Sequence, residues 1–193
     1  LCPRYIGHYV EDVRSGKSPA WMRKRLALSG IRSISPVVDV TNFVLLEMGQ
    51  PMHAFDADDI KDGQIVVRRA REGEKIVTLD KKEFALTNEN LVICDGEKPV
   101  ALAGIMGGLN SEIKEGTKNV FFEAAKFARD NVRKTSRALG QSSDSSFRFE
   151  KGVDAYTTGR GMARALHLIE EIGCGVVTDL CEDVCAADLT PRK

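Results

Sequence analysis

Apolar residues recur at helical spacing in four segments of the chain, and residues typical of helix ends flank each one. Ser35 and Pro36 begin the central segment, since a serine hydroxyl accepts a free backbone N–H and a proline in the first turn needs no donor. Gly49 ends it, because glycine readily adopts the left-handed conformation that closes many helices. Similar signals predict helices at 18–30, 130–140 and 154–173.

Short apolar runs separated by turn residues fill the middle of the chain and predict β-strands at 64–68, 76–79, 83–86, 91–94 and 100–103. Turn residues at 80–82 and 95–97 are typical of hairpin connections, so these strands form a largely antiparallel meander. Further strands are predicted at 3–13, 120–125 and 188–191. The expected fold class is α+β, a largely antiparallel sheet packed with several helices in a layered β/β/α arrangement.

Several side chains carry local expectations. The helix at 18–30 should bury Trp21, whereas His8 should lie on the surface of its strand and His167 on the surface of the last helix. The serine-rich stretch at 141–152 is typical of a flexible linker, but the two aromatic residues near its end, Phe147 and Phe149, favour burial.

Composition narrows the class of protein. The 193 residues are 42% hydrophobic and 29% charged, with 28 basic and 28 acidic side chains, as in an ordinary globular domain. No run of about 18 apolar residues exists, so no membrane partner is expected. The five cysteines show no paired spacing, which favours a reducing, cytoplasmic setting and no metal site. We expect a single domain over 1–193, two intertwined modules sharing a core, excised from a longer subunit because the chain opens on Leu1-Cys2-Pro3.

Candidate chemistry lies around the central helix. Asn42 is a polar residue on an apolar helix, and the chain reverses at Gly49-Gln50-Pro51 before His53, so the two side chains are candidates for one site edge. Three glycines at 104–108 permit close approach to backbone N–H groups, although such a stretch is often only a turn. Glu123 stands between phenylalanines and alanines, either facing solvent from a sheet edge or serving a site.

Four motifs, in order, resemble the editing domain of the bacterial phenylalanyl-tRNA synthetase beta subunit: V-D-V-T-N-F-V-L-L-E-M-G-Q-P-M-H-A-F-D, G-I-M-G-G, F-F-E-A-A and S-D-S-S-F-R-F-E-K-G-V-D. The opening C-P-R-Y and the segment W-M-R-K-R-L-A-L-S-G-I-R-S-I resemble it too, so the likeness covers almost the whole chain. In that family this domain hydrolyses tyrosine wrongly esterified to phenylalanine tRNA. An apolar pocket rejects an added hydroxyl poorly, which is why a second, hydrolytic site is useful.

The resemblance implies a role for each matching residue. Glu123 would read the tyrosine hydroxyl, His53 and Asn42 would lie near the ester as catalytic residues, and Gly107 would keep the pocket floor open. Two serines, Ser143 and Ser145, would border the ring pocket, and Arg32 would lie near the terminal nucleotide. The family often carries threonine and alanine at the two serine positions. His53 acts either as a base or by orienting substrate, with the terminal hydroxyl of the tRNA as a further source of assistance.

The resemblance also implies partners: the acceptor end of tRNA(Phe), the alpha subunit and the rest of the beta subunit, within a heterotetramer. No cofactor is expected in this domain, while ATP and Mg²⁺ are expected for the parent enzyme. Two alternatives stay open at this point. One is a non-catalytic structural or tRNA-binding module of the subunit, and the other is a free-standing protein that edits in trans.

Overall fold

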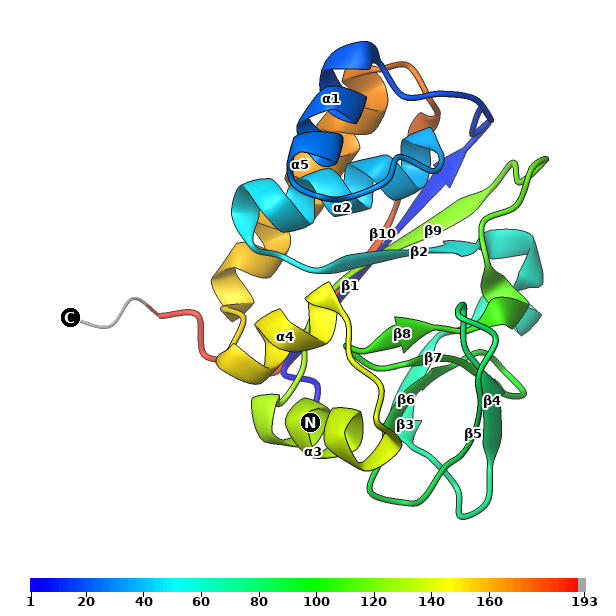
Figure 1. Cartoon of the computed structure of the whole chain (residues 1–193), viewed down its shortest axis with the longest axis vertical. Helices are drawn as coiled ribbons and strands as arrows, with labels where there is room; N and C mark the ends of the chain where they lie inside the picture. The colour runs from blue at the N-terminus through cyan, green and yellow to red at the C-terminus, as the bar shows by residue number, and fades with distance from the viewer. Residues whose placement is uncertain (191–193) are drawn as a thin grey trace.

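A four-stranded antiparallel sheet runs through the middle of the molecule and separates a helical layer from a smaller sheet (Figure 1). The computed structural model describes residues 1–190. In the central sheet the strand order is β10-β1-β9-β2. These strands are β1 (Arg4–Glu11), β2 (Met52–Asp56), β9 (Val120–Lys126) and β10 (Val176–Cys185).

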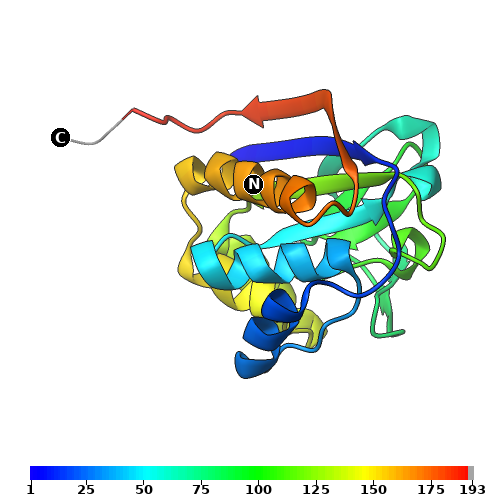
Figure 2. The same ribbon diagram turned by 90° about the horizontal axis from the view of Figure 1, so that it is seen from above.

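One face of the central sheet is covered by helices α1 (Ala20–Leu28), α2 (Pro36–Met48) and α5 (Ala155–Glu171), as the view from above shows (Figure 2). The predicted boundaries of α2 are confirmed. The hydroxyl of Ser35 accepts the backbone N–H of Val38, and Gly49 is left-handed with φ of 70°. Asp154 likewise caps α5 by accepting the N–H of Tyr156.

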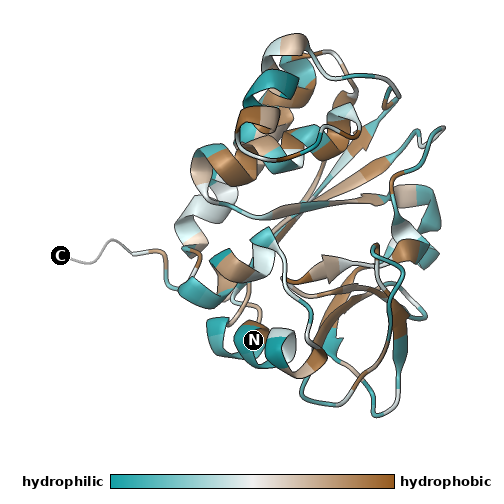
Figure 3. Ribbon diagram, viewed as in Figure 1, coloured by the Kyte–Doolittle hydropathy of each residue, from teal (hydrophilic) through white to brown (hydrophobic). Residues whose placement is uncertain are grey.

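A second antiparallel sheet lies on the other side, with the order β3-β6-β7-β8, beside the hairpin β4-β5. Strands β6 and β7 are apolar and buried, whereas β3 contains two arginines and most of the connecting turns are hydrophilic (Figure 3). The sheet is antiparallel, as expected, but it is not a continuous meander, because β3 pairs with β6 and the hairpin β4-β5 lies outside the sheet. The strands are β3 (Val66–Arg69), β4 (Lys75–Val77), β5 (Glu83–Ala85), β6 (Leu91–Cys94), β7 (Pro99–Leu102) and β8 (Met106–Gly107), with 3₁₀ turns at Ala57–Asp59, Lys61–Gly63 and Leu109–Ser111.

Two further helices close one side of the second sheet: α3 (Arg129–Leu139) and α4 (Asp144–Lys151), which pack against each other. Helix α4 occupies the serine-rich stretch, so that stretch is not a linker. The reason is a reciprocal cap, in which the Ser143 hydroxyl accepts the N–H of Ser146 and the Ser146 hydroxyl accepts that of Ser143.

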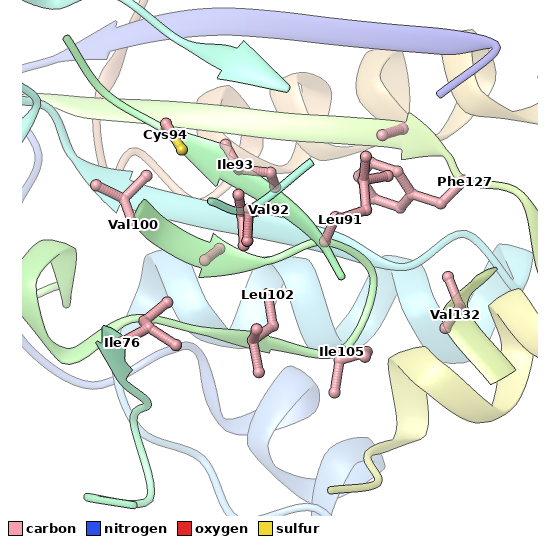
Figure 4. Packing of buried hydrophobic residues seen from close by; sticks show 14 of the residues in the cluster. Ile76, Leu91, Val92, Ile93, Cys94, Val100, Leu102, Ile105, Phe127 and Val132 are labelled. Carbon is pink, nitrogen blue, oxygen red and sulfur yellow. The ribbon is translucent and has the colours of Figure 1, made fainter. Parts of the chain in front are cut away.

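Side chains alternate across the central sheet and divide the core into two clusters. Ala54, Phe122 and Ala124 face the helices and join the cluster formed with α1, α2 and α5. Phe55 and Ala125 face the other way and join the cluster of the second sheet. Figure 4 shows the packing of that second cluster, in which Val132 of α3 and Phe127 lie beside residues of β6 and β7.

The structure corrects several local expectations. The strand near the C-terminus is β10, whereas 188–190 contains no strand, and Pro191 lies outside the described residues. Because β10 runs beside β1, His8 is buried, with its Nε2 2.8 Å from the carbonyl oxygen of Thr178. Two aromatic side chains also differ from expectation, since Phe147 is 60% exposed and Trp21 is 38% exposed, whereas Phe149 is buried as predicted. His167 is exposed, as predicted.

Candidate functional site

A cavity opens where the central sheet, the second sheet and α4 meet. Its volume is about 360 Å³, the open mouth included. The polar groups in its wall come from β2, β9 and α4, and the rest of the lining is mostly apolar. The lining residues are Pro51, Met52, His53, Ile93, Ala101, Leu102, Gly104, Ile105, Met106, Gly107, Glu123, Ser145 and Phe149.

Glu123 reaches this cavity from the central strand β9. It stands directly opposite His53 of β2 on one side and Gly7 of β1 on the other. Directly opposite residues of antiparallel strands project from the same face, with Cβ atoms about 5 Å apart. The register of three strands thus brings the acid and the histidine to one wall of the cavity, and Glu123 is only 5% exposed. The solvent-facing alternative for Glu123 is excluded.

Burial changes the ionisation of Glu123. Removal of its carboxylate from water raises its pKa to about 8, although the hydrogen bond from Tyr5 opposes this shift. The carboxyl group is therefore mainly neutral at pH 7. The hydroxyl of Tyr5 donates to Oε2 at 3.3 Å and leaves Oε1 available to another partner.

His53 is held neutral by the same environment. Burial lowers its pKa to about 4, so its ring carries no charge near pH 7. Phe55 lies edge-on to the imidazole, with ring centroids 4.5 Å apart. The Nε2 atom is buried and has no hydrogen-bond partner among residues 1–190. A buried, unpaired ring nitrogen at a cavity wall is a ready partner for a bound molecule.

Gly107 is required by the position of the histidine ring. A Cβ atom at residue 107 would lie 2.4 Å from Cε1 of His53 and 2.5 Å from its Nε2. Because neither distance is sterically possible, any side chain there would displace the ring. Glycine in β8 therefore lets the two sheets approach closely at the cavity floor.

Helix α4 supplies the side of the cavity that the second sheet leaves open. Ser145 lines the cavity from the first turn of α4. Ser143 does not line it, but its hydroxyl donates to the carbonyl oxygen of Ile105 at 2.6 Å and fastens the start of α4 to the cavity wall. Of the two serines predicted to border the pocket, Ser145 lines the cavity, whereas Ser143 stabilises the position of α4 against the cavity wall.

Asn42 and Arg32 do not line the cavity in the described part of the chain. The helix that carries Asn42 packs with Ala54 and Phe122, on the sheet face opposite to the one from which His53 projects. Arg32 is exposed in the loop between α1 and α2. Contact of these two residues with a substrate stays a prediction.

Tyr5 is the site residue that sequence reasoning missed. The sequence contained a clue to its role. Tyr5 precedes Gly7, the residue opposite Glu123, by two positions on β1, so the two residues face the same side of the sheet. The pairing of β1 with β9 is a long-range feature, however, and only this pairing places the phenol beside Glu123. Burial and the neighbouring Glu123 carboxyl both raise the pKa of Tyr5, so it remains a hydrogen-bond donor.

Comparison with known proteins adds to this geometry. A family model described as the B3/4 domain matches residues 1–174. The chain belongs to the B3/4 domain family. A phenylalanine–tRNA ligase beta subunit of Syntrophus aciditrophicus is 53% identical over 177 residues, which are 92% of this chain and 22% of that protein. The beta subunit of Carboxydothermus hydrogenoformans is 50% identical over 192 residues, 100% of this chain and 24% of that protein.

The B3/4 domain thus spans about a quarter of the length of these curated relatives, and the matches confirm the resemblance indicated by the motifs. An N-terminal fragment of the phenylalanyl-tRNA synthetase beta subunit from Pyrococcus horikoshii has the same fold, with a TM-score of 0.57 and 17% identity. The alignment covers 97% of this chain and 51% of that one. The expected α+β class is confirmed. None of the described helices has the length and apolar character needed to cross a membrane.

Proposed function

We propose that this B3/4 domain hydrolyses tyrosine esterified in error to tRNA(Phe), as part of a phenylalanine–tRNA ligase beta subunit. The observation that carries the proposal is the buried Glu123 carboxyl in the wall of a cavity whose other lining residues are mostly apolar. The tyrosine ring enters between the central sheet and α4, and its phenol donates a hydrogen bond to Oε1 of Glu123. A carboxyl group accepts this bond in both its neutral and its ionised form.

Selection against phenylalanine follows from the same contact. With a phenyl ring bound, the carboxyl oxygen would be buried without a partner, at a cost of about 1–3 kcal/mol. That cost corresponds to roughly five- to 150-fold in preference. Tyr5 supports the selection by occupying Oε2 and limiting the orientations that the carboxyl group can take.

Hydrolysis adds water to the ester carbonyl and releases tyrosine and the terminal ribose hydroxyl of the tRNA. His53, neutral and with a pKa of about 4, is a weak base in the empty cavity. Its free Nε2 is better suited to hold and orient the ester or the attacking water. No step requires a cofactor in this domain, while ATP and Mg²⁺ belong to the synthetic site of the parent enzyme, which also contains the alpha subunit.

The test is hydrolysis of Tyr-tRNA(Phe) and Phe-tRNA(Phe) by the intact protein that carries this domain. We expect faster hydrolysis of the tyrosyl ester. Glu123→Ala should reduce the preference by about ten- to a hundredfold, because the phenol loses its acceptor. The matched variant Glu123→Gln should keep part of it, because an amide oxygen still accepts a hydrogen bond. Undiminished preference in the alanine variant would disprove the assignment of Glu123, and absence of hydrolysis in the wild type would favour a structural module.

A further inference from the structure

Basic side chains are in excess in two segments of this otherwise neutral chain. Residues 13–38 contain six basic and no acidic side chains, but among the described residues only the second segment, 126–151, contributes to the cavity wall. Residues 126–151, which end β9 and form α3 and α4, contain seven basic and three acidic side chains, although the whole chain has 28 of each. A local excess of this kind attracts anions even where the net charge is zero.

Helix α3 carries most of this excess on one face. Arg129, Arg133 and Arg137 recur every four residues, so they lie along one side of the helix at intervals of about 6 Å. Lys134 stands next to them, and all four side chains are exposed. The opposite face is buried, with Val132, Thr135 and Ser136 in the core.

Three of these four cations lack an intramolecular counter-ion. Arg129 lies 3.7 Å from Asp130, a distance typical of a weak surface pair. Within residues 1–190, no carboxylate lies within salt-bridge distance of Arg133, Lys134 or Arg137. Their charges are therefore available to a partner.

The inner face of α3 packs against the cavity wall. Val132, on the inner side of α3, is close enough to Gly104 in the cavity wall that a Cβ at residue 104 would lie 3.2 Å from its Cγ2. Helix α4, which carries the wall residue Ser145, packs directly against α3 (Figure 1). The outer face of α3 is thus about one helix diameter, 10 Å, from the cavity wall.

The end of α3 is also fixed in position. After Gly140, the side-chain amide of Gln141 donates to Asp80 at 3.0 Å and its carbonyl accepts from Lys82 at 3.0 Å. These contacts join the end of α3 to the turn between β4 and β5. The turn adds exposed Lys81 at the same end of the basic face, whereas Lys82 is paired with Asp80 at 3.0 Å.

We propose that the outer face of α3, formed by Arg129, Arg133, Lys134 and Arg137, binds the phosphate backbone of the RNA acceptor end. It thereby directs the esterified 3′ terminus to the cavity. This inference rests on the proposed function and extends it by naming the RNA-binding surface. RNA fits better than an acidic protein, because α3 exposes basic groups without the large apolar side chains that anchor protein interfaces. Phosphates require only positioned donors and charge.

The test measures binding of an acceptor-stem minihelix RNA ending in CCA to the intact protein over a series of salt concentrations. The double variant Arg133→Glu/Arg137→Glu should weaken binding at least about tenfold and reduce the slope of log affinity against log salt by about one to two. The control Lys118→Glu/Arg160→Glu makes the same charge change at exposed positions before β9 and on α5, and it should change affinity less than about twofold. If the charge-reversal variant folds poorly, the neutral double variant Arg133→Gln/Arg137→Gln can be used in its place.

Minihelix affinity and salt slope equal to those of the control variant would overturn the proposal and leave this face to an acidic protein partner. Hydrolysis of a tyrosyl ester of adenosine, which lacks the RNA stem, separates the two proposals. We expect the α3 variants to hydrolyse this small ester as fast as the wild type. If the wild type hydrolyses neither this ester nor Tyr-tRNA(Phe), the proposed function fails, while α3-dependent RNA binding would still support the surface.

Discussion

Burial shifts the pKa values of the two ionisable groups in the cavity in opposite directions. It favours the neutral form of each, so the pKa of Glu123 rises to about 8 and that of His53 falls to about 4. Both groups are mainly uncharged at pH 7, which suits the proposed binding of an aromatic ring. Tyr5 and Gly107 set the geometry, one by a hydrogen bond to the acid and the other by leaving room for the imidazole.

The raised pKa of Glu123 predicts a pH-dependent stability. Between about pH 4.5 and 8 the unfolded chain loses this proton while the folded chain keeps it, so the free energy of unfolding falls as pH rises. Glu123→Gln has no such proton to lose. Relative to the wild type, its unfolding free energy should therefore increase by roughly 4 kcal/mol between pH 5 and pH 9. Denaturant unfolding of both proteins at the two pH values measures this, and a constant difference would contradict it.

Helix α4 shows how one cap links local structure to the site. Ser143 accepts the N–H of Ser146 and donates to the carbonyl of Ile105, so one hydroxyl starts the helix and ties it to the cavity wall. Ser145 is held at the cavity by this arrangement. Arg4 connects the central sheet to a helix in a similar way. Its guanidinium pairs with Asp183 of β10 at 2.6 Å and also donates to the carbonyl oxygen of Ala155, at the start of α5, at 2.7 Å.

Loss of the Ser143 hydroxyl should therefore affect both folding and the site. Ser143→Ala removes a helix cap and should lower the free energy of unfolding by about 1 kcal/mol. It should also slow hydrolysis of the tyrosyl ester, because α4 loses its hydrogen bond to the cavity wall. Ser143→Thr keeps a hydroxyl and should retain most of both properties. Chemical denaturation and the hydrolysis assay measure the two effects, and unchanged stability in the alanine variant would show that the cap contributes nothing.

The whole molecule depends on one sheet that both hydrophobic clusters share. Phe122 and Ala124 of β9 belong to the helical cluster, while Ala125 of the same strand belongs to the cluster of the second sheet. Neither cluster can lose its packing without exposing one face of this strand. We infer that the two layers unfold together.

Ile93→Ala tests this coupling. Ile93 is buried in the second sheet, and its truncation should lower the free energy of unfolding by about 2–5 kcal/mol. Trp21, the one tryptophan of the chain, lies in the helical layer and packs edge-on to Phe43. Its fluorescence transition should shift to lower denaturant as far as the far-UV circular dichroism transition does. A tryptophan transition that stays in place would mean that the layers unfold independently.

Sequence reasoning succeeded where local chemistry decides the structure. The caps of α2 and α5, the left-handed Gly49 and Gly140, and the hairpins β4-β5 and β6-β7 all follow from residues within a few positions of one another. It was less successful at the end of the chain. In β10 the exposed apolar side chains Leu180 and Val184 alternate with acids rather than marking a buried face, and the strand is formed by pairing with β1.

The sequence alone determined the fold class, the candidates His53, Gly107, Glu123 and Ser145, and the family to which they point. Tertiary structure decided which candidates meet. Strand register places Glu123 opposite His53, sheet packing brings Gly107 against the imidazole, and the pairing of β1 with β9 adds Tyr5. The physical reason is that hydrogen-bonding and steric preferences act within a few residues, whereas burial and the pKa shifts that it causes depend on segments far apart in the chain.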